Sequence, residues 1–198
     1  MTDTPTGPQP SLGKERGIVL RLVPHPDFPS RAIQSISVDV EREADGNLLL
    51  KYRVTGAIEE VLWPSSQPQS SGPTDRLWEH SCFEAFMGRP DEPGYIELNA
   101  TTALEWALYA FDDYRTGMTA VDLAFSATMR FGGDSLEVRV SLLPEDSRYD
   151  GDLLLGLSAI IEAKDGSKSY WALKHPPGAP DFHNRDCFTA RLAAPSGA

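Results

Sequence analysis

The sequence has few cysteines, few basic residues and no long apolar run. Its two cysteines, Cys82 and Cys187, form no CxxC pair and have no histidine at a metal-binding spacing, so support for a metal site is weak. Each precedes a phenylalanine, which favours buried free thiols. No apolar run approaches the roughly 20 residues that span a bilayer. The polar, proline-rich residues 1–10 lack the pattern of a secretory signal, so we expect a cytoplasmic protein.

The balance of charge excludes whole classes of partner. There are 18 Lys and Arg residues against 29 Asp and Glu residues, which gives a net charge of -11. Nucleic-acid phosphates and anionic membranes are bound by clustered basic residues, and no such stripe is present. The GxSxG, GxGxxG and P-loop motifs are also missing. We therefore expect a small-molecule ligand, no catalytic residues, and neither a nucleic-acid nor a membrane partner.

Apolar and polar residues alternate with period two along most of the chain, which is typical of half-buried strands. An Asp45-Gly46 turn separates two such stretches, 33–41 and 48–54, and predicts a hairpin. Together with residues 17–23, the other expected strands are 77–87, 95–100, 105–111, 123–130, 135–143, 153–162, 169–173 and 187–192. Strands at this spacing predict an all-β fold, an antiparallel, jelly-roll-like β-sandwich of about ten strands.

The length of 198 residues suits one domain, since all-β sandwiches reach about 200 residues as a single unit. We expect residues 16–193 to form it, with a flexible N-terminal tail at 1–15 and a C-terminal tail at 194–198. A polar loop at 64–75 is longer than most connections, and such loops are functional or disordered. Residues 101–110 also carry helical spacing, but the alternation around Trp106 and Leu108 favours a strand.

Two motifs carry a family resemblance. The segment Arg-Leu-Trp-Glu-His-Ser-Cys-Phe-Glu at 76–84 and the segment Tyr-Trp-Ala-Leu-Lys-His-Pro at 170–176 resemble the DOMON-like superfamily. Within it, the chain is most similar to a bacterial subgroup named after a cell-wall reductase and is related to carbohydrate-binding module family nine. The resemblance implies a β-sandwich with a pocket, in which some members bind a sugar between two aromatic rings and others bind haem. It matches Trp78 and Phe182 to the two rings, with phenylalanine where the sugar binders have tryptophan.

The resemblance and the strand periodicity converge on one candidate cleft. Counting by two from Trp78 places His80 and Glu84 on the same face. A carboxylate that faces a core must be paired or used, so Glu84 either binds a ligand or forms a salt bridge with Arg76 or Arg53. Trp171 belongs either to the core or to the cleft. The expected ligand-binding residues are Arg76, Trp78, His80, Glu84, Asn99, Trp171, Phe182 and His183. Such a cleft suits a saccharide or a similar small polar metabolite, without a cofactor.

The same residues are compatible with other ligands and functions. Haem would need a facing Met/His pair, for which Met118 or Met129 could serve, whereas Met87 lies on the wrong face. Zinc or iron could bind a set built from His80, His175, His183 and Glu84. Glu84 and Glu97 could act on a glycosidic bond if their carboxyl groups were about 5 to 9 Å apart. The sandwich could also be filled and serve only to bind another protein. Oligomeric state is not indicated.

Overall fold

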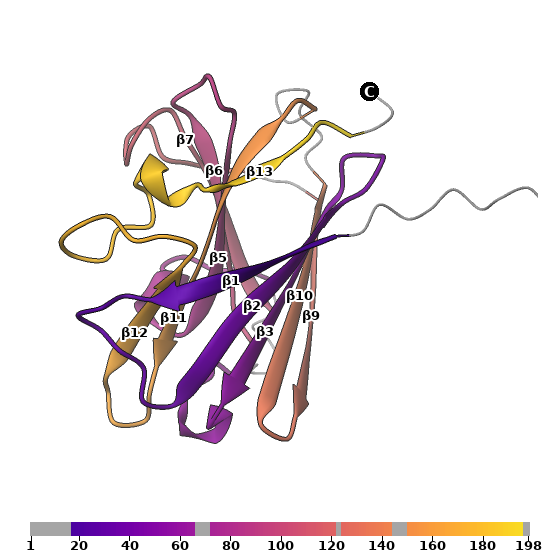
Figure 1. Ribbon diagram of the computed structural model, residues 1–198. Coiled ribbons are helices and arrows are strands. Elements are labelled where there is room, and N and C mark those ends of the chain that lie inside the picture. Colours follow the sequence, from indigo (N-terminus) through magenta and orange to yellow (C-terminus); the bar gives the residue numbers. More distant parts are fainter. Residues whose placement is uncertain (1–16, 66–71, 122–123, 144–149, 196–198) are drawn as a thin grey trace, which may run out of the picture.

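A computed structural model describes residues 17–65, 72–121, 124–143 and 150–195 (Figure 1). Nearly all its regular structure is β, as predicted. The strands are β1 (Ile18–Pro24), β2 (Ile33–Arg42), β3 (Leu48–Gly56), β4 (Gly72–Pro73), β5 (Cys82–Gly88), β6 (Tyr95–Ala100), β7 (Glu105–Phe111), β8 (Thr119–Ala120), β9 (Ala124–Gly132), β10 (Ser135–Leu143), β11 (Leu153–Glu162), β12 (Lys168–Ala172) and β13 (Ala190–Leu192). The described residues also include the short 3-10 helices η1 (Ile58–Glu60), η2 (Leu77–Glu79) and η4 (Arg185–Cys187).

The strands form one sheet that curls into two facing halves. Its order is β4-β7-β6-β5-β11-β12-β1-β2-β3-β10-β9, with β8 and β13 paired to β7 and β11. Strand β1 joins the halves, because residues 18–22 pair with β2 whereas Val23 and Pro24 pair with β12. Apart from the short parallel pair β4 and β7, the described strand pairs are antiparallel. The predicted antiparallel β-sandwich is thus confirmed.

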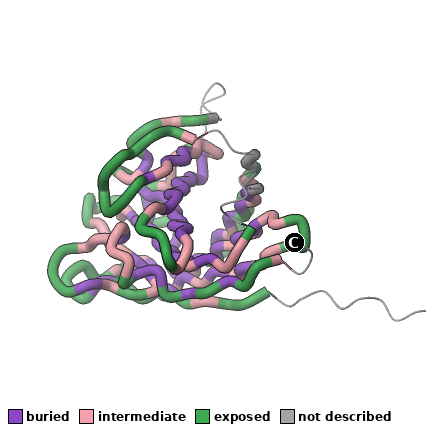
Figure 2. The backbone as a smooth tube through the Cα atoms, turned by 90° about the horizontal axis from the view of Figure 1, so that it is seen from above, coloured by how far each residue is buried: buried purple, intermediate pink, exposed green. Residues whose placement is uncertain are grey.

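The main hydrophobic core lies between the two halves and follows the period-two pattern. Val38, Leu50 and Val138 come from one half, and Phe83 and Leu157 come from the other. All five are 1% exposed or less. In Figure 2 the buried residues follow the strands, while the peripheral loops are exposed. Burial of alternate side chains against the facing half therefore holds the sandwich together.

The outer face of the β5–β6–β11 half is also buried, so this half has apolar residues on both faces. A second cluster there includes Cys82, Phe86, Tyr95 and Ile160 from the strands, and Phe188 from the C-terminal segment that covers them. Figure 1 shows this segment in yellow on the side of β11 and β12 that faces away from β2, β3 and β10. The outer face is where the pocket described below lies.

Local departures from the predicted strands have clear causes. The strand expected at 77–87 begins only at Cys82, because Arg76 adopts a left-handed conformation (φ 62°) and η2 follows it. Residues 101–104 form a turn, while the strand preferred for the following segment is confirmed as β7. The strand expected at 187–192 is shortened to β13 by η4. The predicted tail at 1–15, residues 196–198 and residues 66–71 of the predicted loop lie outside the described residues.

Among the described residues, no helix is long and apolar enough to cross a membrane.

Candidate functional site

The site is built on the outer face of the strands β11, β5 and β6. Strand register places Ser158 and Asn99 on either side of Glu84, while Glu97 lies beside Phe86 on the next rung. Because alternate residues share a face, these five side chains point away from the sandwich core. The face therefore presents two carboxyl groups, an amide and a hydroxyl beside an aromatic ring.

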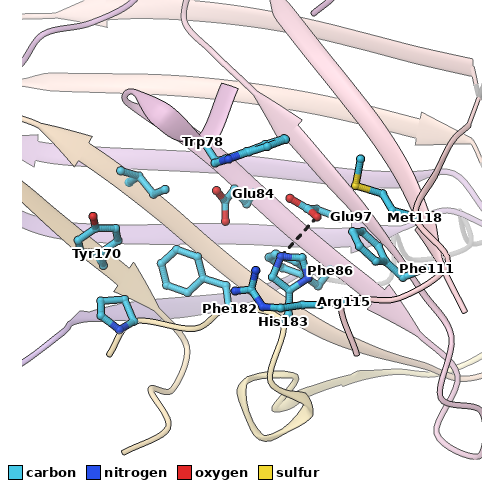
Figure 3. Close-up of a pocket in the computed structure, with 12 residues that line it drawn as sticks. Trp78, Glu84, Phe86, Glu97, Phe111, Arg115, Met118, Tyr170, Phe182 and His183 are labelled. Carbon is cyan, nitrogen blue, oxygen red and sulfur yellow. Dashed lines mark ion pairs between the residues drawn. The ribbon is translucent and has the colours of Figure 1, made fainter. Parts of the chain in front are cut away.

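A pocket of about 330 Å³ opens over this face (Figure 3). In the figure Trp78 lies on one side and Phe182 and His183 on the other, with the carboxyl groups of Glu84 and Glu97 between them. The walls are mostly aromatic and apolar, and the charged groups converge from the floor and the rim. The complete lining is Trp78, Glu84, Phe86, Glu97, Phe111, Arg115, Met118, Ile160, Tyr170, Pro180, Phe182 and His183.

Three connecting segments supply part of the walls, whereas Phe86, Phe111 and Tyr170 come from strands. Trp78 is carried by η2, and its ring meets the edge of the Tyr109 ring at 6.0 Å between centroids. Arg115 follows β7, and its Nη2 donates to Asp181 Oδ1 at 2.9 Å. Tyr114 Oη donates to the other oxygen of Asp181, also at 2.9 Å. These two bonds tie the segment after β7 to the C-terminal segment that carries Phe182 and His183.

Glu84 is a buried carboxyl group, with 2% of the residue exposed. Its Oε1 accepts a hydrogen bond from Cys82 Sγ at 3.3 Å, and its Oε2 accepts one from Ser158 Oγ at 3.0 Å. Among the described residues it has no ion-pair partner, so the salt bridge considered with Arg76 or Arg53 is not formed. Burial, and then the nearby charge of Glu97, raise the pKa of Glu84 to about 8.

Glu97 lies deeper than its charge would suggest, with 5% of the residue exposed. Asn99 Nδ2 donates to its Oε1 at 2.7 Å, and His183 Nε2 lies 3.7 Å from its Oε2. Burial raises the pKa of Glu97 above its ordinary value. The amide oxygen of Asn99 is fully buried and accepts no hydrogen bond from the described part of the chain. The floor therefore holds acceptors that the protein's own donors do not saturate.

His183 is neutral at pH 7. Burial, followed by the charge of Arg115, lowers the pKa of its imidazole to about 4. Tyr95 Oη lies 2.8 Å from His183 Nδ1 and accepts from the Arg115 backbone N–H at 3.2 Å. A hydroxyl that accepts from Arg115 can donate to Nδ1, which leaves the imidazole proton on Nε2, facing Glu97. The contact drawn between His183 and Glu97 in Figure 3 is thus not an ion pair at neutral pH.

Only part of the predicted ligand-binding set meets in the pocket. Trp78, Glu84, Phe182 and His183 line it, and Asn99 lies next to Glu97 below them. The remaining three predicted residues are placed elsewhere.

Arg76 is exposed and pairs with Glu79, away from the pocket. His80 is also exposed and contacts Glu162, with 2.8 Å from Nδ1 to Oε2. The count by two that put His80 beside Glu84 fails because η2 is not a strand. Trp171 is buried in the sandwich core, where its Nε1 donates to Ser169 Oγ at 3.1 Å.

Several pocket residues were not foreseen as ligand-binding residues. Phe86 could have been found by continuing the period-two count from Glu84. Glu97 was considered only as a catalytic partner, because its position beside Phe86 depends on strand register. Met118 was considered only as a haem ligand. Arg115 lies with it in the connection after β7, where nothing in the sequence signals that the chain folds back toward Phe182.

The groups weighed for metal binding are not brought together. His175 Nε2 contacts the Val23 carbonyl at 2.9 Å, and His80 contacts Glu162 on the surface, so neither joins His183 and Glu84. No cluster of three or more His, Cys, Asp or Glu side chains that could hold a metal ion occurs among the described residues. Burial raises the pKa of the Cys82 thiol well above its ordinary value, which makes it a poor nucleophile.

Comparison with known proteins supports the fold. No protein-family model and no curated protein matches the sequence. The chain is similar to the crystal structure of a protein from Bacteroides uniformis named as a candidate carbohydrate-binding protein, with a TM-score of 0.62 and 16% identity over 89% of this chain and 86% of that one.

Two structures of a family 9 carbohydrate-binding module from Caldicellulosiruptor kristjanssonii also match. The complex with cellotriose has a TM-score of 0.47 and 10% identity, over 81% of this chain and 75% of that one. The complex with glucose has a TM-score of 0.44 and 9% identity, over 76% and 71%. At these identities the likeness concerns the fold alone.

Proposed function

We propose that this protein is a non-catalytic binding protein whose pocket holds a saccharide. The observation that carries the proposal is the composition of the pocket, which combines the aromatic faces of Trp78 and Phe182 with buried acceptors from Glu84 and Glu97. A sugar ring has apolar C–H faces that stack on aromatic rings and hydroxyl groups that donate to carboxylates. The similarity in fold to a protein named as a candidate carbohydrate binder supports the proposal.

The size of the pocket agrees with this ligand class. A volume of about 330 Å³ lies at the lower end of the range for small-molecule sites. It admits one or two sugar rings at the bottom and leaves the rest of a longer chain in solvent. The DOMON-like kinship that the motifs indicate is part of the same proposal, because that superfamily includes both sugar binders and haem binders.

One specific observation favours haem as the ligand, since Met118 and His183 both line the pocket. Against it, His183 Nδ1 already contacts Tyr95 and its Nε2 faces Glu97. A visible absorption spectrum and metal content of the purified protein separate the two readings, because haem gives a Soret band. A Soret band at stoichiometric haem would overturn the saccharide proposal.

Isothermal titration with a panel of monosaccharides and disaccharides tests the proposal directly. We expect at least one sugar to bind, and Trp78→Ala to weaken that binding at least tenfold because the stacking face is lost. Trp63→Phe is the matched control, since Trp63 packs against the sandwich core and its Nε1 donates to Ile58. If no sugar in the panel binds to the wild-type protein, the proposal fails. Equal losses in both variants would also contradict it.

A further inference from the structure

The floor of the pocket holds more hydrogen-bond acceptors than donors. Glu84 and Glu97 contribute four carboxyl oxygens, and Asn99 contributes its amide oxygen. Among the described residues, the side-chain donors that reach these oxygens are Cys82 Sγ, Ser158 Oγ and Asn99 Nδ2. An ionised carboxylate can accept about four hydrogen bonds, so most of this capacity is unused once a ligand holds both glutamates in their ionised form. A bound molecule that fits this floor must supply donors.

The floor offers no cation to an ionised Glu84, and with a pKa of about 8 this carboxyl group is mostly protonated at pH 7 in the free protein. No described side chain forms an ion pair with Glu84, and the imidazole facing Glu97 is neutral at pH 7. Arg115 is the cationic residue of the lining; its guanidinium group is bound to Asp181, and it lowers the pKa of Glu84 and Glu97 less than their burial raises it. A buried carboxylate without a cation is unstable unless it is protonated or a ligand compensates it. A ligand that brings a positive charge can take the place of the proton on Glu84, because a cation beside a carboxyl group lowers its pKa.

The walls fit the same ligand. Trp78, Phe86, Phe111, Tyr170 and Phe182 surround the carboxyl groups, and aromatic faces attract cations. A quaternary ammonium group would use the rings but could not donate to the five acceptors. A neutral sugar would donate hydrogen bonds but could not compensate an ionised carboxylate. A primary ammonium group does both, because it carries three N–H donors and one positive charge.

We propose that the pocket selects an amino sugar, whose ammonium group lies between Glu84 and Glu97 while its ring stacks on Trp78 or Phe182. This inference rests on the proposed saccharide-binding function and narrows it to basic sugars. Asn99 would accept one hydrogen bond from the ammonium group or from an adjacent hydroxyl group. Arg115, held by Asp181, would stay at the rim and would not compete for the carboxylates.

Matched pairs of sugars test the inference by isothermal titration at pH 7. The pairs are glucosamine with glucose, galactosamine with galactose, and mannosamine with mannose, and cyclohexylamine serves as an amine without hydroxyl groups. We expect the amino sugar of at least one pair to bind tenfold or more tightly than its neutral partner. Glu84→Gln and Glu97→Gln should each reduce that preference to threefold or less. Glu137→Gln, which removes the same charge from β10 on the other half, should leave it unchanged.

The outcomes separate the two proposals. If neutral sugars bind as tightly as their amino partners, the amino-sugar inference is overturned and the saccharide function stands. If cyclohexylamine binds as tightly as the amino sugars, the pocket recognises an ammonium group without the sugar ring, and both the saccharide function and its narrowing to amino sugars fail. If none of these compounds binds, both proposals fail.

Discussion

Replacing Glu84 by glutamine should make the protein more stable in alkaline solution. The pKa of Glu84 rises from 4.5 to about 8 on folding, because burial and the charge of Glu97 disfavour its ionised form. Between these two pH values the folded state binds more protons than the unfolded state, so stability falls as pH rises. One pKa unit corresponds to about 1.4 kcal/mol, which sets an upper limit of about 5 kcal/mol for the loss. Glutamine keeps the size and polarity of the protonated acid, and Glu84→Gln should escape that loss.

Guanidinium unfolding at pH 5, 6.5, 8 and 9, followed by tryptophan fluorescence, measures the effect. At pH 5 the wild-type protein and the Glu84→Gln variant should differ by less than about 1 kcal/mol, because the folded wild type is protonated there. At pH 9 the variant should be more stable by about 2 to 5 kcal/mol. Glu137→Gln controls for the removal of one negative charge and should not show this gain. If the free energy of unfolding depended on pH in the same way for Glu84→Gln and the wild type, the raised pKa of Glu84 would be refuted.

Two further predictions concern the packing that supports the pocket. Tyr52→Phe removes a buried hydroxyl group that donates to the Glu84 carbonyl at 2.6 Å. Urea unfolding should show that the variant loses about 1 to 2 kcal/mol of stability with an unchanged m-value. An unchanged stability would mean that this hydrogen bond does not stabilise the fold. Gly156→Ala places a methyl group 2.7 Å from Phe188 Cδ1 and should cost about 1 to 3 kcal/mol. Gly132→Ala, where the nearest atom is Ser135 Oγ at 3.7 Å, should cost less, and an equal loss would contradict the steric explanation.

The sandwich could be predicted because its core obeys a short-range rule. In β3, Leu48, Leu50, Tyr52 and Val54 alternate with less buried residues, and every second side chain is buried against the facing half. The Asp45-Gly46 turn fixes where the hairpin of β2 and β3 reverses, and Gly46 has a positive φ of 89° as that turn requires. Local pattern and turn chemistry were therefore sufficient to predict this part of the fold.

The site residues could be predicted only where they follow the same alternation of side chains along a strand. Glu84 was identified because a carboxylate in the apolar strand β5 is conspicuous, and its outward direction follows from alternation. The rule failed at His80, since η2 and the left-handed Arg76 break the strand before Cys82. It could not place Arg115 beside Asp181 either, because that contact joins residues 66 positions apart through two irregular segments.

Strand β5 shows how this fold separates binding from stability. Phe83, Ala85 and Met87 pack into the sandwich core, whereas Glu84 and Phe86 face the pocket. Because the two sets alternate along one strand, the pocket residues can be replaced without opening a cavity between the halves. The unfavourable free energy of burying the Glu84 carboxyl group therefore arises on the outer face, where a ligand with donor groups and a positive charge can offset it. A site that lowers stability in the free protein and recovers it on binding should stabilise the fold strongly when occupied.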